Sequence, residues 1–308
     1  MKTNIKRLSL RFATVTMVLA AFGMPMRASA CSVCIAHALG AAMHALGAQT
    51  LPNGTVIFGF NYATFTKSNE GEDPGTTEHE TFNQYSFDVN YGLNDRVVLR
   101  LSVPWVDKDI RITGEQSNNA HGLGDVLLGA TFQLPPKAND SVVTAFTLDL
   151  KLPTGANNDK DSDGTLREQH LQVGTGSTDV ILGAEFSMEG SQGSMWIAGI
   201  RGRINGSNNR HYSYGNVLFY DLGYVKPVGH GGAVVLDFNG RIADKDRTED
   251  GSKDPNSGGH LGYLSFSYRQ GLKHDIGVIA TYQVPVWKQL NGSQSESPLF
   301  SLGVSKTF

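Results

Sequence analysis

The sequence predicts an all-β protein: a transmembrane antiparallel up-and-down β-barrel of about twelve strands with a short N-terminal periplasmic tail. Three observations predict this fold. From residue 53 onward, apolar and polar residues alternate with a period of two, which is typical of strands with one apolar face. The connections between the predicted strands are alternately short and long, and aromatic residues recur near both ends of the apolar faces.

Residues 1–30 are typical of a signal peptide. A basic start precedes the apolar stretch "FATVTMVLAAFG", which is too short to span a bilayer, and the small residues at 28–30 form a cleavage site. We therefore expect Sec-dependent export. Cleavage removes five basic residues and no acidic ones, so the formal net charge changes from −3 to −8 (−3 − 5 = −8). This acidity argues against nucleic acid as a partner.

Residues 31–52 form a Cys/His tail or plug that does not fit the barrel pattern. Cys31, Cys34, His37 and His44 offer thiolate and imidazole ligands that suit copper or zinc, and His44 lies two helical turns after His37. Cys34 is followed by Ile35 instead of histidine, so the motif for covalent haem attachment is absent. A disulfide between the two cysteines, lipidation of Cys31, a tail without any ligand and a segment that plugs the lumen are the alternatives.

Residues 53–308 carry the alternating pattern of the barrel. In "NQYSFDVNYGL", Tyr85, Phe87 and Val89 share one face, while Ser86 and Asp88 lie on the other. The same pattern occurs in twelve segments: "VIFGFNYATF", "NQYSFDVNYGL", "VVLRLSVPW", "DVLLGATFQL", "VVTAFTLDLKL", "DVILGAEFSM", "MWIAGIRGRI", "NVLFYDLGYV", "AVVLDFNGRI", "GYLSFSYR", "IGVIATYQV" and the terminal segment. An even number of strands places both ends of the barrel chain on the periplasmic side.

The connections sort into two kinds, which we expect at opposite ends of the barrel. Short ones such as "ND" and "PVGHGG" alternate with long, polar and acidic ones such as "TGANNDKDSDGTLREQ". Outer-membrane barrels have short periplasmic turns and longer outer loops. The mature chain has no run of eighteen apolar residues, so membrane-spanning helices are not expected. These features predict a multi-pass barrel in the cell outer membrane, in contact with its lipid.

Aromatic residues mark both predicted membrane interfaces. One belt lies near the short turns: Tyr91, Phe132, Phe186, Trp196, Tyr224, Tyr268 and Phe308. A second lies near the long loops: Tyr85, Trp105 and Tyr282. The chain ends on Phe308, which we expect to be the terminal aromatic residue by which the barrel-assembly machinery recognises the last strand. That strand closes the barrel against the first, because lipid cannot satisfy an exposed strand edge.

An internal repeat links the strands to a known family. "GLGDVLLGATF" (122–132) and "GSTDVILGAEF" (176–186) match at seven of eleven positions. Together with the intervening "LKLPTG" and the terminal aromatic residue, they resemble the bacterial outer-membrane barrels associated with the meta-pathway of phenol degradation. The resemblance covers nearly all of residues 53–308. It implies a barrel that passes small, aromatic molecules, and it brings no catalytic or binding residues to transfer.

The polar faces of the predicted strands carry charged residues that we expect to line a narrow lumen. They are Asp88, Arg100, Asp125, Asp149, Lys151, Asp179, Glu185, Arg201, Arg203, Asp221, Asp237, Arg241 and Arg269. Arg201 and Arg203, flanked by strands that bear Glu185 and Asp221, are the predicted constriction. A salt-bridged interior that only rigidifies the barrel is an equally consistent interpretation.

Histidines precede the strands that descend from the long loops. They are His79, His121, His170, His211 and His260, and they predict a ring of imidazoles at the outer rim that captures metal or changes charge near neutral pH. Polar residues tolerated at a wet rim are the simpler alternative. The nearby "DKDSDG" (159–164) opens like a calcium loop, but His170 stands where that loop requires glutamate, so an EF-hand is not expected.

The function that these features predict is passive passage of small-molecule solutes, with no catalysis and no cofactor. A lipid hydrolase built into a barrel is one alternative, although the chain lacks a Gly-x-Ser-x-Gly motif. A barrel that handles copper or zinc through the Cys-x2-Cys-x2-His tail is another.

Overall fold

The computed structural model describes residues 48–70, 77–113, 118–135, 141–160, 164–167 and 169–308. The signal peptide and the four predicted ligands Cys31, Cys34, His37 and His44 lie outside these ranges. Within them, the regular structure is strand apart from three short 3-10 turns: η3 Gln169–Leu171, η4 Ser191–Gly193 and η5 Lys273–Asp275. No helix in this part of the chain is long and apolar enough to cross a membrane.

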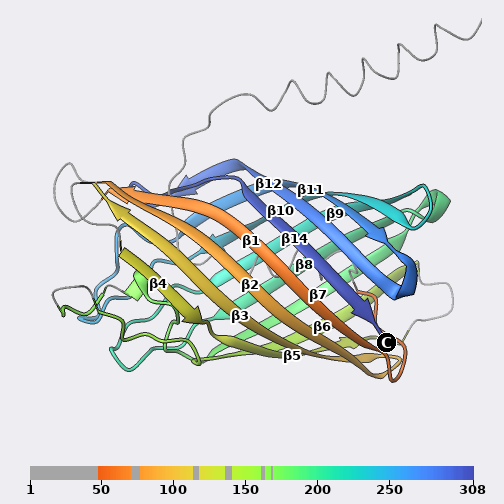
Figure 1. Ribbon diagram of the computed structural model, residues 1–308, viewed down its shortest axis with the longest axis horizontal. Helices are drawn as coiled ribbons and strands as arrows, with labels where there is room; N and C mark the ends of the chain where they lie inside the picture. Colours follow the sequence, from red (N-terminus) through yellow and green to blue (C-terminus); the bar gives the residue numbers. More distant parts are fainter. Residues whose placement is uncertain (1–47, 71–76, 114–117, 136–140, 161–163, 168) are drawn as a thin grey trace, which may run out of the picture.

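The strands follow one another around a single antiparallel sheet (Figure 1). Their bounds are β1 Val56–Glu70, β2 Thr77–Asn94, β3 Val97–Ile112, β4 Asn118–Leu123, β5 Val126–Gln133, β6 Val142–Leu152, β7 Asp179–Glu189, β8 Met195–Ile204, β9 Val217–Val228, β10 Gly232–Ala243, β11 Gly259–Gly271, β12 Ile276–Leu290, β13 Ser295–Glu296 and β14 Leu299–Thr307. The sheet closes where β1 pairs with β14, with Ile57 opposite Thr307 and Thr64 opposite Phe300. The predicted closed barrel is confirmed.

Two of the barrel's twelve strands are each interrupted once. β4 and β5 both pair with β3, on either side of Gly124 and Asp125, and β13 and β14 both pair with β1, on either side of Ser297 and Pro298. At the first interruption, Gly124 N–H donates to the Pro104 carbonyl over 2.8 Å, while Pro104 has no N–H to return. Such irregularities re-aim a side chain, and here the residue that is turned inward is Asp125.

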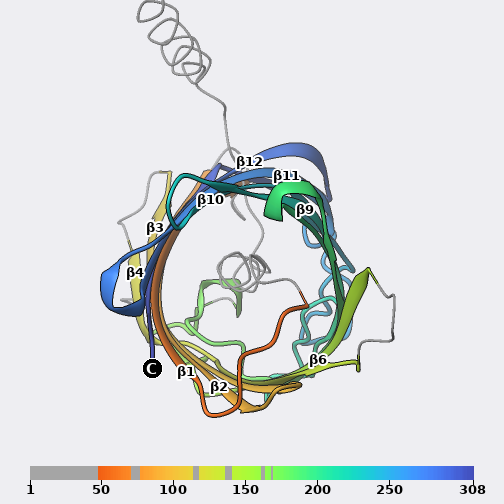
Figure 2. The same ribbon diagram turned by 90° about the vertical axis from the view of Figure 1, so that its right-hand side faces the viewer.

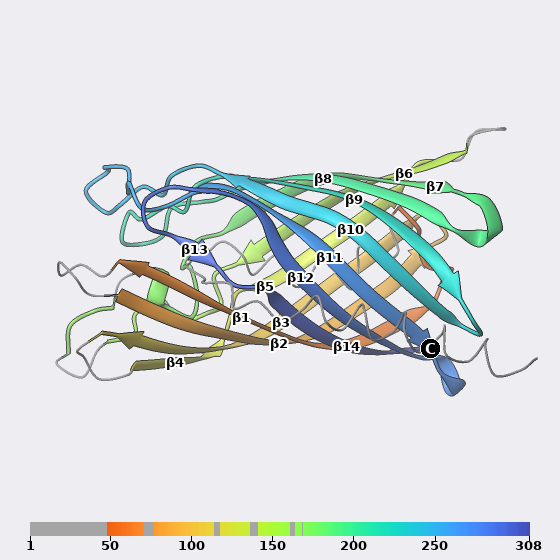
Figure 3. The same ribbon diagram turned by 90° about the horizontal axis from the view of Figure 1, so that it is seen from above.

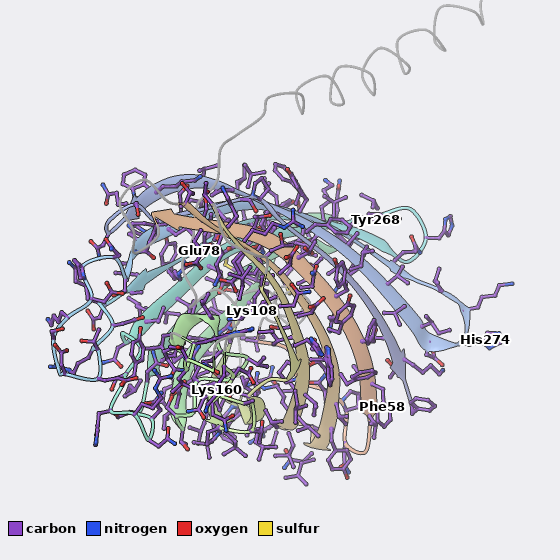
Figure 4. All side chains as sticks on the ribbon, turned by 60° about the vertical axis from the view of Figure 1, so that its left-hand side comes forward. Phe58, Glu78, Lys108, Lys160, Tyr268 and His274 are labelled. Carbon is purple, nitrogen blue, oxygen red and sulfur yellow. The ribbon has the colours of Figure 1, made fainter. Side chains whose placement is uncertain are left out.

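The two ends of the barrel differ as predicted. Long loops gather at one end, and the short turns and the C-terminus lie at the other (Figures 1 and 3). Figure 4 shows Lys160 at the long-loop end and His274 at the short-turn end. Phe308 belongs to the short-turn end, where its ring lies 5.8 Å from that of Phe58, and its N–H donates to the Val56 carbonyl over 2.8 Å.

The outer surface of the wall is apolar and the inner surface is largely polar. Outward-facing Leu182 and Leu222 are more than half exposed, whereas inward-facing neighbours such as Glu185 are buried. This inversion of an ordinary soluble core is expected when lipid covers the outside. Inside, Val173 of the loop 153–178 joins a buried apolar cluster with wall residues: Ala63, Phe65, Phe82, Val106, Ala120 and Leu299. Figure 2 shows part of this loop, in green, inside the ring of strands.

Candidate functional site

The lumen has a filled half near the long loops and a hollow half near the short turns. Buried ion pairs and the described part of the loop 153–178 occupy the first. The second contains a cavity of about 420 Å³. The candidate site is this cavity together with the loop that covers it.

A buried ionic cluster lies where β5 begins and β6 ends. Lys151 Nζ lies 2.7 Å from Asp125 Oδ2 and 3.1 Å from Asp179 Oδ2, and Arg203 Nη2 lies 2.6 Å from Asp179 Oδ2. Asp125 and Asp179 occupy the same position in the two sequence repeats, so the repeat places a carboxylate on each side of one lysine. All four side chains are buried, and the charges balance, as buried charges must.

The same cluster holds the loop 153–178 in place. Asp125 accepts hydrogen bonds from the backbone N–H groups of Gly155 and Thr175, each over 3.0 Å, and from the Thr175 hydroxyl over 2.7 Å. Lys151 donates to the Ser177 carbonyl over 2.8 Å. Both arms of the loop are therefore tied to one carboxylate and its lysine.

A neighbouring loop supports the middle of the first. Asn208 Nδ2 donates to Gln169 Oε1 over 2.6 Å, and the Tyr214 hydroxyl donates to the Gln169 carbonyl over 3.0 Å. Burial raises the pKa of Tyr214, so this phenol keeps its proton and remains a donor. Gln169 is itself buried, so the turn η3 rests on a solvent-shielded polar contact.

The loop crosses the lumen to the opposite wall. It leaves from β6 and β7, yet Val173 packs with Phe65 of β1, Phe82 of β2 and Leu299 of β14. The wall near the long loops contains further buried ion pairs. Glu80 lies 2.9 Å from Lys67 and 3.4 Å from Lys108, and Arg241 lies 2.6 Å from Glu296. These contacts fill the half of the lumen near the long loops.

The cavity lies between this filled region and the short turns. Its apolar lining includes Leu51, Ile57, Val98 and Ile279. Its charged lining consists of Asp88, Arg100, Glu185, Arg201 and Arg269. The cavity is therefore amphipathic, with carboxylate, guanidinium and aliphatic groups facing the same space.

The chain before β1 crosses the opening at the short-turn end, as the orange-red segment in Figure 2 shows. Ala48 is fully buried, and its N–H donates to Ser187 Oγ on β7 over 2.7 Å. The Thr50 hydroxyl donates to the Asp95 carbonyl in the turn after β2 over 2.9 Å. Leu51 then lines the cavity, so this segment narrows the entrance from the short-turn side.

Inward-facing glycines let the ion pairs lie flat against the wall. A Cβ atom on Gly183 would lie 2.5 Å from Arg201 Cγ, and one on Gly199 would lie 2.5 Å from Asp221 Oδ1. Gly129, at the same repeat position as Gly183, leaves room in the same way for Asp149, whose Oδ1 lies 2.7 Å from Arg100 Nη2. The charged side chains fold along the wall instead of across the lumen, and this leaves the cavity open.

The structure brings some of the predicted lumen residues together and separates others. Arg201 Nε lies 2.8 Å from Glu185 Oε1, and Arg201 Nη2 lies 3.6 Å from Asp221 Oδ1, beside the cavity. Arg203 belongs instead to the ionic cluster with Asp179. The two arginines of the predicted constriction therefore lie in different layers of the lumen. Whether Arg201 constricts a solute stays a prediction.

The remaining lumen residues take different places. Asp237 accepts a hydrogen bond from Asn239, Arg241 pairs with Glu296, and Arg269 lines the cavity.

Residues 75–294 match the model of the family described as "Putative MetA-pathway of phenol degradation". The chain belongs to this family. The resemblance that the sequence motifs suggested is thereby confirmed. A search of curated proteins returned no match.

Two solved structures show how this family member resembles other barrels. An outer membrane channel from Pseudomonas putida F1 superposes with a TM-score of 0.65 and 14% sequence identity, over 84% of this chain and 97% of that chain. The translocator domain of the autotransporter NalP from Neisseria meningitidis gives a TM-score of 0.52 and 8% identity, over 90% of this chain and 96% of that chain. At these identities the likeness concerns the fold, which supports a location in the outer membrane.

The predicted rim histidines lie apart. His79 is exposed on the outside of β2, and His121 lies beside Trp105 with 6.5 Å between the ring centroids. His211 is in a loop with φ of 62°, and His260 Nε2 lies 2.8 Å from the Tyr220 hydroxyl. The side chain of His170 is not among those described. Within the described part of the chain, no three His, Cys, Asp or Glu residues are placed to hold a metal ion, and the rim metal site stays a prediction.

Sequence reasoning missed the inward course of the loop 153–178. One signal was present: "LQV" at 171–173 places two apolar residues in an otherwise polar connection, and both Leu171 and Val173 are buried. It also missed Glu296 and Asn61, which pair with Arg241 and Asp88. Their partners come from distant strands, so spacing along the chain gave no indication of them.

Proposed function

We propose that this family member is a passive outer-membrane channel for small molecules and that it is not an enzyme. The observation that carries the proposal is the cavity of about 420 Å³ inside a closed barrel, bounded by ion pairs that fold against the wall. Supporting it, the chain shares its fold with an outer membrane channel. A charged, water-accessible interior is typical of barrels that conduct polar or small amphipathic solutes.

Small aromatic compounds are the solutes that we propose first. The family description refers to phenol degradation, and the aliphatic side chains of Leu51, Ile57, Val98 and Ile279 offer the cavity surface that an aromatic ring prefers. The neighbouring ion pairs would accept the polar substituent of such a compound.

Passage requires the loop 153–178 to leave the lumen, because its described part fills the half nearer the long loops. Both arms of the loop are hydrogen-bonded to Asp125, so this residue would be the fixed point about which the rest of the loop moves. We therefore propose a closed state with the loop inside the lumen, as described above, and an open state in which the loop is displaced.

A deletion tests the proposal. Gly174 N–H donates to the Ala156 carbonyl over 2.7 Å, so removal of residues 157–173 joins two backbone positions that are already adjacent. In planar lipid bilayers, we expect this variant to show severalfold higher conductance than the wild type. The matched control removes residues 248–252, which the bridge between Arg247 and Lys253 closes in the same way outside the lumen. The proposal fails if neither the wild type nor the first deletion conducts.

The two alternative functions gain no support from the described geometry. His260 is engaged by Tyr220, and its ring centroid lies 6.0 Å from that of Trp287, which is packing at the rim. We therefore propose no lipid hydrolase. Copper or zinc binding by Cys31, Cys34, His37 and His44 stays a proposal from sequence. It is tested by the metal content of the mature protein with and without the two cysteines.

A further inference from the structure

The charges inside the barrel are divided unequally between its two halves. In the filled half, each buried cluster is balanced: Asp125 and Asp179 with Lys151 and Arg203, Glu78 and Glu80 with Lys67 and Lys108, and Glu296 with Arg241. Two acids meet two bases in each of the first two clusters, and one meets one in the third. Within these three clusters the charges cancel.

The hollow half is different. Inside the rim, where Glu189 is exposed, the inward-facing charged residues of the described strands are Asp88, Asp149, Glu185, Asp221 and Asp237 against Arg100, Arg201 and Arg269. The three arginines, Asp88 and Glu185 line the cavity itself, and Asp149 and Asp221 pair with Arg100 and Arg201 from behind this lining. Five carboxylates and three guanidinium groups give a formal charge of −2 (3 − 5 = −2). The sequence alone does not reveal this negative excess, because the predicted lumen residues of both halves together carry nearly equal numbers of acidic and basic groups.

Two of these carboxylates are held by neutral groups. Asp88 accepts a hydrogen bond from Asn61 Nδ2 over 2.6 Å and one from the Ser86 hydroxyl over 3.3 Å. Asp237 accepts from the side-chain amide of Asn239. Amides and hydroxyls hold a carboxylate in place without cancelling its charge, and neither aspartate forms a salt bridge with a described residue.

We infer that the cavity selects small organic cations, namely an ammonium group carried on an apolar body, over the corresponding anions. A fixed negative excess inside walls of low dielectric constant concentrates cations, as rings of carboxylates do in cation channels. Asp88 lines the cavity and faces the same space as Ile57 and Ile279, so one ligand can meet the carboxylate and the aliphatic surface together. This inference deepens the proposed function, since it names the preferred class of solute for the same site.

The test uses three probes of similar size that differ in charge: 2-phenylethylammonium, 2-phenylethanol and 3-phenylpropanoate. Their binding to the detergent-purified mature protein is measured by isothermal titration calorimetry at mildly alkaline pH. Under these conditions the carboxylate probe is ionised and the ammonium probe is protonated. We expect the ammonium probe to bind about tenfold more tightly than the carboxylate probe, which corresponds to about 1.4 kcal/mol.

A double variant identifies the residues responsible. Asp88→Asn with Asp237→Asn brings the formal charge of this half to zero and keeps an oxygen for each amide donor. We expect the preference for the ammonium probe to fall to about onefold, while affinity for 2-phenylethanol stays unchanged. The control, Asp107→Asn with Asp109→Asn, removes two carboxylates from the outward face of β3 and should keep the wild-type preference.

The outcomes separate this inference from the channel proposal. Equal binding of the charged probes to the wild type, tighter binding of the carboxylate probe, or an unchanged preference in the double variant would overturn the inference. The first two comparisons need no variant, so misfolding of a mutant cannot obscure them. Ammonium-selective binding without any conductance would overturn the channel and leave the inference standing. Conductance without a preference for the ammonium probe would overturn the inference and leave the channel proposal standing.

Discussion

Lys151 holds together the buried ionic cluster in the filled half of the lumen. It contacts Asp125, Asp179, Thr175 and the carbonyl of Ser177, so one ammonium group joins three strands and a loop. It stabilises the fold by neutralising two buried carboxylates.

Replacement of Lys151 by methionine should destabilise the barrel strongly. The change leaves Asp125 and Asp179 with a single arginine between them, and breaking a buried ion pair on one side costs about 3–5 kcal/mol. We expect urea-induced unfolding in detergent to show a loss of this size. Lys253→Met, in an exposed loop, is the matched control. A loss of less than about 1 kcal/mol would show that water reaches the cluster.

Gly183 controls the width of the cavity. Because a Cβ there would press on Arg201 Cγ and on Thr147 Oγ1 at 2.6 Å, Gly183→Ala should push the arginine away from the wall and into the lumen. We expect a destabilisation of about 1–3 kcal/mol from overpacking, together with a lower conductance. On the same sheet, Gly202 faces outward with nothing within 4 Å of the same position, so Gly202→Ala should change neither quantity. Equal behaviour of the two variants would contradict the role given to the glycine.

At the scale of elements, the loop 153–178 combines a polar hinge with an apolar anchor. The hinge is the Asp125 cluster, and the anchor is Val173 among Phe65, Phe82 and Leu299. Replacing the anchor with a charged residue should release the loop while leaving the hinge intact, because a carboxylate is not tolerated in an apolar cluster.

Val173→Asp should therefore expose the loop to protease. Arg167 is buried in the folded loop, and its guanidinium donates to the Asn119 carbonyl over 2.9 Å. We expect trypsin to cleave after Arg167 in the variant at least about tenfold faster than in the wild type, since cleavage follows the population of the open form. Leu166→Asp, at an exposed position of the same loop, tests whether an added negative charge alone speeds cleavage. Resistance of both variants would show that the hinge holds the loop without its anchor.

The C-terminal strand joins the scale of elements to that of the whole molecule. Phe308 exchanges backbone hydrogen bonds with Val56 of 2.8 and 3.1 Å, at the seam where the barrel closes. We predict that Phe308→Ala lowers the amount of folded barrel in the outer membrane, measured as the heat-modifiable band on a gel, more than Phe300→Ala does on the same strand. If the two variants accumulate equally, recognition by the assembly machinery does not depend on the last residue.

For the whole molecule, alternation of residue types was sufficient to predict the wall. The period of two places Leu182 in lipid and Glu185 in the lumen without knowledge of any contact, and the sorted connections indicate the two ends. The interruption at Gly124 and Asp125 was not predicted, because it depends on Pro104 of the neighbouring strand. The interior was predicted in composition but not in pairing. Arg201 and Arg203 are two residues apart, about 7 Å along a strand, and so fall in separate layers with separate partners.

The loop 153–178 could not be placed from sequence for a related reason. Its polar composition is typical of a solvated outer connection, and only contacts with β1, β2 and β14 decide that it folds inward. Those contacts join Val173 to residues more than ninety positions away in the chain, such as Phe65. Local patterns do not contain such pairings.

The unequal division of charge between the two halves has a consequence for how the protein responds to ionic strength. The balanced clusters are buried, so dissolved ions screen them little, and the barrel should be about equally stable in dilute and concentrated salt. The cavity of the hollow half has room for water and ions, so its excess is screened once the Debye length falls from about 10 Å at 0.1 M to about 3 Å at 1 M. Salt should therefore abolish discrimination between solutes while leaving the scaffold intact, so that one titration separates what holds the barrel together from what it recognises.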